Sequence, residues 1–176
     1  MSGAIIPVST PAQTELVATI ARQVWTQHYV PIIGLAQVQY MLDRFQSVTA
    51  IRQQMETGHE YFLIRQIMST GQSARNTIND AVGYMDVVAQ PDSNKLFLSK
   101  LYVVDAVRGC GFGRQLFNHA LSLARQRQLH AVWLTVNKFN PSLQIYLRWG
   151  MVNTGSIVKD IGNGFVMDDY QLELAV

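Results

Sequence analysis

Between residues 101 and 117 an apolar segment runs into a glycine-rich turn and then into a helical pattern. The turn reads Arg108-Gly109-Cys110-Gly111-Phe112-Gly113-Arg114. Glycine lets the backbone approach a ligand closely, because it has no side chain. The first turn of a helix has unpaired N–H groups and carries the positive end of the helix dipole. The segment is therefore expected to bind an anion such as a phosphate or pyrophosphate, flanked by two arginines.

Two other glycine-rich motifs do not fit this turn. Its glycines follow a G-x-G-x-G pattern, which differs from the G-x-G-x-x-G fingerprint of dinucleotide-binding proteins. The turn also lacks the Gly-Lys-Ser/Thr ending of a P-loop, so nucleotide hydrolysis is disfavoured. Taken alone, the pattern leaves two interpretations open, an anion site and a tight turn of small residues.

Composition is typical of one globular domain spanning residues 1–176. Apolar residues make up 48% of the 176 and charged residues 15%. The formal net charge of +2 is too balanced for a nucleic-acid surface, so no nucleic-acid partner is expected. The four histidines show no zinc-ligand spacing, so no metal site is expected.

Sequence signals for a membrane or for export are also lacking. No apolar run approaches the ~20 residues that a membrane helix needs, so no membrane partner is expected. The first ten residues do not have the pattern of a signal peptide. A single cysteine, Cys110, excludes an intrachain disulfide and fits a reducing compartment. We therefore expect a cytoplasmic protein.

Hydrophobic periodicity and turn residues predict alternating helices and strands. Thr10, Pro11 and Gln13 form a helix start with a capping box, and Gly162-Asn163-Gly164 is a hairpin turn. Gly83 weakens its strand or marks a bulge. Helices are predicted at 11–28, 35–45, 48–56, from 112 onward and 141–149; strands at 5–8, 61–67, 81–89, 95–104, 130–136, 151–161 and 165–174; loops at 30–34 and 69–79. This order predicts an α/β (α+β) fold with a mixed sheet and helices on both faces.

Two motifs in register resemble the GNAT superfamily of N-acetyltransferases. The first is Leu101-Tyr102-Val103 followed by Arg108-Gly109-Cys110-Gly111-Phe112-Gly113, which is similar to the family's acetyl-CoA motif. The second is Leu134-Thr135-Val136-Asn137-Lys138-Phe139-Asn140, then Tyr146-Leu147-Arg148-Trp149-Gly150-Met151. The resemblance covers residues 95–155, and the segment Met167-Asp168-Asp169-Tyr170 also looks like small-molecule members. It implies a mostly antiparallel sheet of six or seven strands.

The resemblance implies a CoA site in these motifs. Backbone N–H groups of the turn, from Gly109 to Arg114, would hold the pyrophosphate. Backbone groups around Tyr102, namely those of Leu101 and Val103, would pair with the pantetheine arm. The implied cofactor-binding residues are Leu101, Tyr102, Val103, Arg108, Gly109, Cys110, Gly111, Phe112, Gly113, Arg114, Asn137 and Asn140. For Cys110 a small filler is favoured over a covalent role, and either asparagine can instead be a turn residue.

The implied reaction is direct attack of a primary amine on the thioester of acetyl-CoA. Tyr146 is the candidate general acid, because a phenol can protonate the leaving thiolate. Packing alone is the alternative role for Tyr146. The separation of Asn140 from Tyr146 is one residue shorter than is usual in the family, and Met151 replaces the usual Phe. This spacing leaves the assignment of Asn140 more open than that of Tyr146.

No clear general base stands out. The family often carries a glutamate on the strand before the phosphate turn, whereas residues 96–100 contain no carboxylate. Asp86 is the candidate base, since it shares a strand face with Tyr84; deprotonation through water is the alternative. A small-molecule amine is favoured over a protein amine as the acceptor, and its candidate binding residues are Trp25, His28, Tyr29 and Tyr40. Trp25 also lies on the buried stripe of its helix, so a role in the core is favoured for it.

Two other properties stay open at this point. The resemblance implies that a homodimer can form through the last strands. It also allows a CoA-binding sensor or regulatory module that has lost turnover, because the strand carboxylate is missing.

Overall fold

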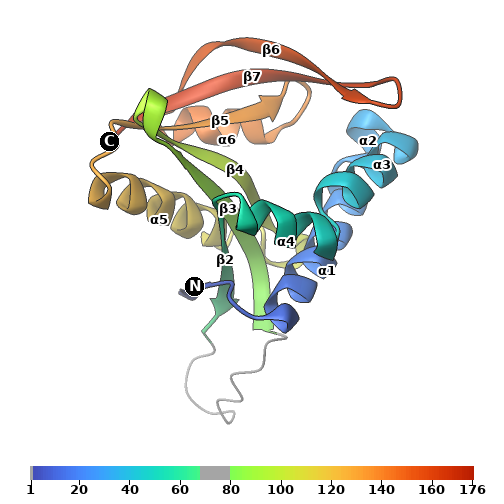
Figure 1. Ribbon diagram of the computed structural model, residues 1–176, viewed down its shortest axis with the longest axis horizontal. Coiled ribbons are helices and arrows are strands. Elements are labelled where there is room, and N and C mark those ends of the chain that lie inside the picture. The colour runs from blue at the N-terminus through green and yellow to red at the C-terminus, as the bar shows by residue number, and fades with distance from the viewer. Residues whose placement is uncertain (1, 68–79) are drawn as a thin grey trace. The chain divides into compact units, whose positions relative to one another are not determined.

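The computed structural model describes residues 2–67 and 80–176 (Figure 1). The predicted loop at 69–79 lies outside the described residues. The helices are α1 (Pro11–His28), α2 (Val30–Ile33), α3 (Leu35–Phe45), α4 (Val48–Glu56), α5 (Phe112–Gln126) and α6 (Ser142–Arg148). The strands are β1 (Gly3–Pro7), β2 (His59–Gln66), β3 (Ala81–Gln90), β4 (Lys95–Val103), β5 (Ala131–Asn137), β6 (Val152–Gly162) and β7 (Phe165–Ala175). Every predicted helix and strand is present, with small shifts at the ends.

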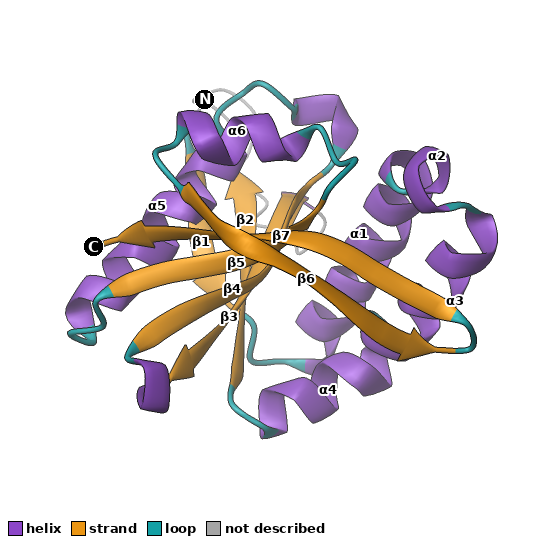
Figure 2. Cartoon of the chain, turned by 90° about the horizontal axis from the view of Figure 1, so that it is seen from above, coloured by secondary structure: helices purple, strands orange, loops and turns teal. Residues whose placement is uncertain are grey.

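The strands form one seven-stranded sheet in the order β1-β2-β3-β4-β5-β7-β6 (Figure 2). Strands β4 and β5 are parallel. The pairs β1–β2, β5–β7 and β6–β7 are antiparallel. The sheet is therefore mixed, as the strand order of the sequence predicted. Among the described residues, no helix is long and apolar enough to cross a bilayer.

The chain divides into two compact units. The first unit comprises Met1–Val87 and Lys100–His119, and the second comprises Val88–Ser99 and Ala120–Val176. Strands β3 and β4 and helix α5 each contribute residues to both units. A single domain over residues 1–176 stays a prediction.

In the first unit, the start of α1 follows the predicted cap. The Thr10 hydroxyl accepts a hydrogen bond from the Gln13 N–H, and the Gln13 side-chain oxygen accepts one from the Thr10 N–H, which completes the capping box. The apolar stripe of α1 is buried, with Val17 and Ala21 fully inaccessible. Helix α4 packs on α1 and on β2. The helices therefore cover the strands of this unit through the face that the sequence pattern predicted.

The prediction of a loop over residues 30–34 is wrong. Residues Val30–Ile33 form the short helix α2, which has Pro31 in its first turn. A proline is compatible with this position because a first-turn N–H has no intrahelical partner. Gly34 ends the helix with a φ of +82°. The proline and the glycine therefore mark the two ends of a helical turn.

Gly83 lies in a continuous strand at a point where two backbones approach closely. A Cβ atom added there would lie 2.5 Å from the carbonyl oxygen of Tyr102 and 3.2 Å from the Cα of Val103. No bulge is needed to explain this glycine. It allows β3 to lie against the segment of β4 in which the acetyl-CoA motif begins.

Replacing Gly83 is therefore expected to displace that part of β4. We predict that Gly83→Ala lowers the free energy of unfolding by about 1–3 kcal/mol, the usual cost of overpacking. Urea denaturation measures this change. The control is Val82→Ala, which shortens the partly exposed neighbouring side chain. Equal stabilities of Gly83→Ala and the unmodified chain would contradict the steric argument.

Candidate functional site

The glycine-rich turn has an open backbone surface. Gly109 and Gly111 have φ values of +77° and +88°, and a Cβ at either position would meet no atom within 4 Å. Helix α5 begins directly after them, with its first bond from the Gln115 N–H to the Gly111 carbonyl at 3.1 Å. Phe112 is buried and anchors the start of this helix. The first-turn N–H groups and the open glycines suit a pyrophosphate.

The two arginines around the turn already make contacts with other side chains of the protein. The Arg108 guanidinium forms an exposed ion pair with Asp105 at 3.0 Å. The Arg114 guanidinium lies 5.8 Å from the centroid of the Phe117 ring. Cys110 is a free, partly buried cysteine. Backbone groups are therefore the main anion ligands that this turn offers.

The pairing of β4 with β5 covers only the first part of each strand. Lys95 to Phe97 lie opposite Ala131 to Trp133, whereas β4 continues to Val103 and β5 to Asn137. Strand β5 stays paired with β7 through Asn137. The last part of β4, from Leu101 to Val103, is partly exposed. Such a strand segment can pair with an extended ligand that carries amides, so it fits the pantetheine arm of CoA.

Asp86 lies in a buried polar network of the first unit. Its carboxylate is fully buried and accepts a hydrogen bond from Lys100 Nζ at 2.7 Å. His59 Nδ1 lies 2.8 Å from the same oxygen, Oδ2. Two cationic or donor groups from β4 and β2 therefore hold this carboxylate.

The network continues from Lys100 to α4. Lys100 Nζ also donates to Gln54 Oε1 at 2.8 Å, and the Tyr61 hydroxyl donates to the same oxygen. Lys100 Nζ lies 5.0 Å from the centroid of the Tyr61 ring. Burial lowers the pKa of Lys100, while the adjacent Asp86 carboxylate opposes that shift. Because Asp86 is enclosed by its partners, direct proton removal by this carboxylate would require the network to open. Its role as a base stays a prediction.

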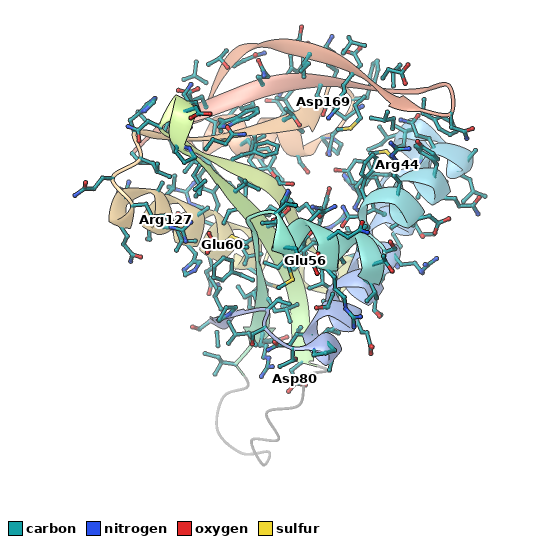
Figure 3. The ribbon with its side chains drawn as sticks, in the orientation of Figure 1. Arg44, Glu56, Glu60, Asp80, Arg127 and Asp169 are labelled. Atoms are coloured by element: carbon teal, nitrogen blue, oxygen red, sulfur yellow. The ribbon has the colours of Figure 1, made fainter. Side chains whose placement is uncertain are left out.

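Three of the four predicted acceptor-side residues lie together. The rings of Trp25 and Tyr29 stack with centroids 4.4 Å apart, and the His28 ring meets Tyr29 edge-on at 4.9 Å. The hydroxyl of Tyr40, on α3, accepts a hydrogen bond from Arg44 Nη1 at 2.8 Å. Figure 3 shows Arg44 on α3. The aromatic group is therefore centred on the end of α1.

The second unit contains Tyr146 and both asparagines. Tyr146 is half-buried on α6 and meets the Trp149 ring edge-on at 5.7 Å. Asn137 Oδ1 accepts from the Phe139 N–H at 3.0 Å, and Asn140 Oδ1 accepts from the Ser142 N–H at 2.9 Å. Both asparagines therefore stabilise local turns. Their contacts with CoA, and the acid role of Tyr146, stay predictions.

Sequence reasoning singled out Asp86 but missed its partners, and it did not single out Asp169. Leu96, Leu98 and Lys100 are buried at alternate positions of β4, so strand periodicity alone could have placed Lys100 inside. Asp169, labelled in Figure 3, is 3% exposed on β7. Burial raises its pKa, and a hydrogen bond from Thr135 opposes that shift. In the sequence, Asp169 appeared only within the segment Met167 to Tyr170, which resembles small-molecule members of the family.

Comparison with known proteins gives a family match and similar folds. A profile described as the acetyltransferase (GNAT) family matches residues 32–151. No match was found among curated proteins. The PaiA N-acetyltransferase of Thermoplasma acidophilum, solved with coenzyme A, is 16% identical over 100% of both chains, with a TM-score of 0.72.

Two further solved structures have the same fold. A GCN5-related N-acetyltransferase of Rhodopseudomonas palustris is 15% identical over 100% of this chain and 97% of its own, with a TM-score of 0.77. Mutant forms of the spermidine/spermine N-acetyltransferase SpeG of Vibrio cholerae are 15% identical over 99% of this chain and 95% of their own, with a TM-score of 0.64. At these identities the likeness establishes the fold.

The buried ion pair leads to a stability prediction. Lys100→Met and Asp86→Asn should each lower the free energy of unfolding by about 3–5 kcal/mol, because each leaves a buried partner without compensation. The double variant should lose much less than the sum of the two. Urea denaturation of the four proteins measures this double-mutant cycle.

The matched control is the ion pair in which Lys95 Nζ lies 2.6 Å from Glu173 Oε2. Its two side chains are 29% and 26% exposed. The same cycle there should give a coupling of at most about 1 kcal/mol. Additive losses at Lys100 and Asp86 would mean that their interaction contributes nothing to stability.

Proposed function

Because the chain belongs to the acetyltransferase (GNAT) family and uses acetyl-CoA, we propose that it acetylates a primary amine, with a small-molecule amine as the acceptor. The observation that carries this proposal is the open glycine turn at the start of α5, which offers backbone N–H groups to a pyrophosphate. The SpeG neighbour acts on spermidine and spermine, so its fold accommodates a small amine. The family leaves the acceptor of this chain unspecified.

In the proposed donor site, the N–H groups from Gly109 to Arg114 hold the pyrophosphate of CoA. Backbone groups of Leu101 and Val103 pair with the pantetheine amides, supported by the short β4–β5 pairing. Asn137 or Asn140 adds a hydrogen bond to the pantetheine arm. Acetyl-CoA supplies a thioester, whose carbonyl carbon is electrophilic and can be attacked by an amine.

In the proposed reaction, the neutral amine attacks the thioester carbonyl carbon. The C–N bond forms, the C–S bond breaks, and the thiolate takes a proton from the Tyr146 hydroxyl. The tyrosinate then regains a proton from solvent. The amine gives up its own proton to water or, through the Lys100 and His59 contacts, to Asp86. Water is the simpler acceptor, because the Asp86 carboxylate is fully buried and paired.

A second candidate is a CoA-binding module without turnover, favoured by the paired state of Asp86. Release of free thiol from acetyl-CoA across a panel of amines separates the two. Amine-dependent release supports the enzyme, whereas acetyl-CoA binding with no release on the panel supports the module.

We also propose a homodimer through the last strands. Strand β6 ends the strand order, and its apolar side chains Val152, Ile157 and Val158 are exposed. An edge strand of this kind can pair with a second copy. Analytical ultracentrifugation tests this proposal, and a monomeric mass at micromolar concentration would contradict it.

The donor site predicts a position-specific effect of glycine replacement. Gly111→Ala should weaken acetyl-CoA binding at least about tenfold, because a Cβ would enter the pyrophosphate surface and the residue has a left-handed φ. Isothermal titration with acetyl-CoA measures the change. The control is Gly164→Ala, which has a φ of +76° and equally open space but lies in the β6–β7 turn.

Both alanine variants should lose about 1–2 kcal/mol of stability to backbone strain. Only Gly111→Ala should also lose affinity for acetyl-CoA. Equal affinities of the two variants would contradict the placement of the pyrophosphate.

The general-acid assignment predicts that Tyr146→Phe lowers kcat about 100-fold while the Kd for acetyl-CoA stays nearly unchanged. Steady-state thiol release and titration measure the two quantities. Tyr170→Phe is the control, since it removes the hydroxyl of a half-buried tyrosine on β7. An unchanged kcat in Tyr146→Phe would show that Tyr146 only packs.

A further inference from the structure

An aromatic cluster in the first unit joins the end of α1 to β3 and β4. The Tyr102 ring lies 5.8 Å from Trp25, 6.2 Å from Tyr29 and 5.4 Å from Tyr84, measured between centroids. Trp25 is 5% exposed and Tyr84 is fully buried, whereas Tyr29 and Tyr102 are partly exposed. We call Trp25, Tyr29, Tyr84 and Tyr102 the aromatic cluster. The cluster therefore has two partly exposed tyrosine rings, Tyr29 and Tyr102, packed on the buried rings of Trp25 and Tyr84.

Strand geometry connects this cluster with the proposed donor site. Tyr102 lies between Leu101 and Val103, whose backbone groups are proposed to pair with pantetheine. Side chains two residues apart on a strand share a face, so Tyr102 is on the face of Lys100. A ligand on the Tyr102 ring would therefore lie beside the strand that holds the acetyl donor.

The indole N–H of Trp25 is the polar group in the cluster that suggests a bound ligand. The buried Trp25 Nε1 has no hydrogen-bond partner among the described residues. A buried donor left unpaired costs about 1–3 kcal/mol. An oxygen atom on a bound molecule would accept this hydrogen bond and remove that cost.

The charges around the cluster disfavour a polycation. Among the described residues, the carboxylate that adjoins Tyr84 of the cluster is Asp86, which already pairs with Lys100 and lies against His59. The residues hydrogen-bonded to Tyr84 and Lys100 include the uncharged Gln46 and Gln54. A single ammonium group can rest against aromatic faces, but a polyamine needs a carboxylate for each further charge.

We propose that the aromatic cluster is the acceptor site and that the acceptor is an arylalkyl primary amine whose ring carries an oxygen. This inference rests on the proposed function and specifies its substrate class. The aromatic body of the amine stacks on Tyr29 and Tyr102, and its ring oxygen accepts from Trp25 Nε1. The amine nitrogen then lies along β4 beside the donor strand.

The test compares tyramine, phenethylamine and spermidine as acceptors. The kcat/KM for tyramine should exceed that for spermidine at least about tenfold. Tyr102→Leu should raise the KM for tyramine about tenfold and leave the Kd for acetyl-CoA nearly unchanged, because the contacts proposed between this strand and CoA are made by backbone groups, which the substitution keeps. Phe97→Leu, which shortens a ring stacked on Trp133 outside the cluster, should change neither. A preference for spermidine, or an unchanged KM in Tyr102→Leu, would overturn the proposal.

The oxygen is tested with Trp25→Phe, which keeps a ring but removes the N–H donor. The ratio of kcat/KM for tyramine to that for phenethylamine should fall about fivefold, the value of one hydrogen bond. If that variant unfolds, the methoxy compound 4-methoxyphenethylamine, an acceptor only, should match tyramine with the unmodified chain. Equal use of phenethylamine and both oxygen-bearing amines would overturn the oxygen contact.

Equilibrium titration of tyramine into the CoA-bound protein distinguishes failure of the site from failure of the proposed function. Tyramine binding that Tyr102→Leu abolishes, without acetylation, would retain the site and reject the enzyme. Acetylation of spermidine without tyramine binding would retain the enzyme and reject the site. Absence of tyramine binding in any form rejects the site.

Discussion

The buried ion pair between Asp86 and Lys100 constrains the first unit more than any other interaction. Removing a carboxylate and an ammonium from water is costly, and the cost is recovered only when geometry and further hydrogen bonds are favourable. Here His59 and Gln54 supply those bonds, at 2.8 Å in each case. The four residues come from β2, α4, β3 and β4, so the pair fixes the mutual positions of these elements.

This ion pair also affects which ligands could bind near Asp86. A free buried carboxylate would attract a cation, but this one is already compensated. The Tyr61 and Tyr84 rings lie near this carboxylate, and Tyr102 packs on Tyr84, so dispersion and ring electrostatics are the interactions left to select a ligand there. In the proposed acceptor site, the residues that stabilise the unit would therefore disfavour highly charged amines.

The sequence allowed most of the fold to be predicted because its signals are local. Thr10 and Gln13 predicted the start of α1, and Gly162-Asn163-Gly164 predicted the β6–β7 hairpin. The error at residues 30–34 arose because Pro31 and Gly34 suit both a loop and the two ends of a short helix. Gly83 was interpreted locally, as a weak point of its strand or a bulge, whereas the reason for it lies in β4, about twenty residues further along the chain.

The donor and acceptor sites differ in how far sequence could predict them. Backbone recognition needs glycine at fixed positions of one turn, so the proposed pyrophosphate site leaves a continuous motif at Gly109 to Gly113. Side-chain recognition needs only that rings meet in space. Trp25 and Tyr102 lie 5.8 Å apart but are separated by most of the first unit in sequence. No spacing rule connects them, so the proposed acceptor class rests on the packed structure, in which the Trp25 indole N–H lacks a partner among the described residues and the Asp86 carboxylate is already paired.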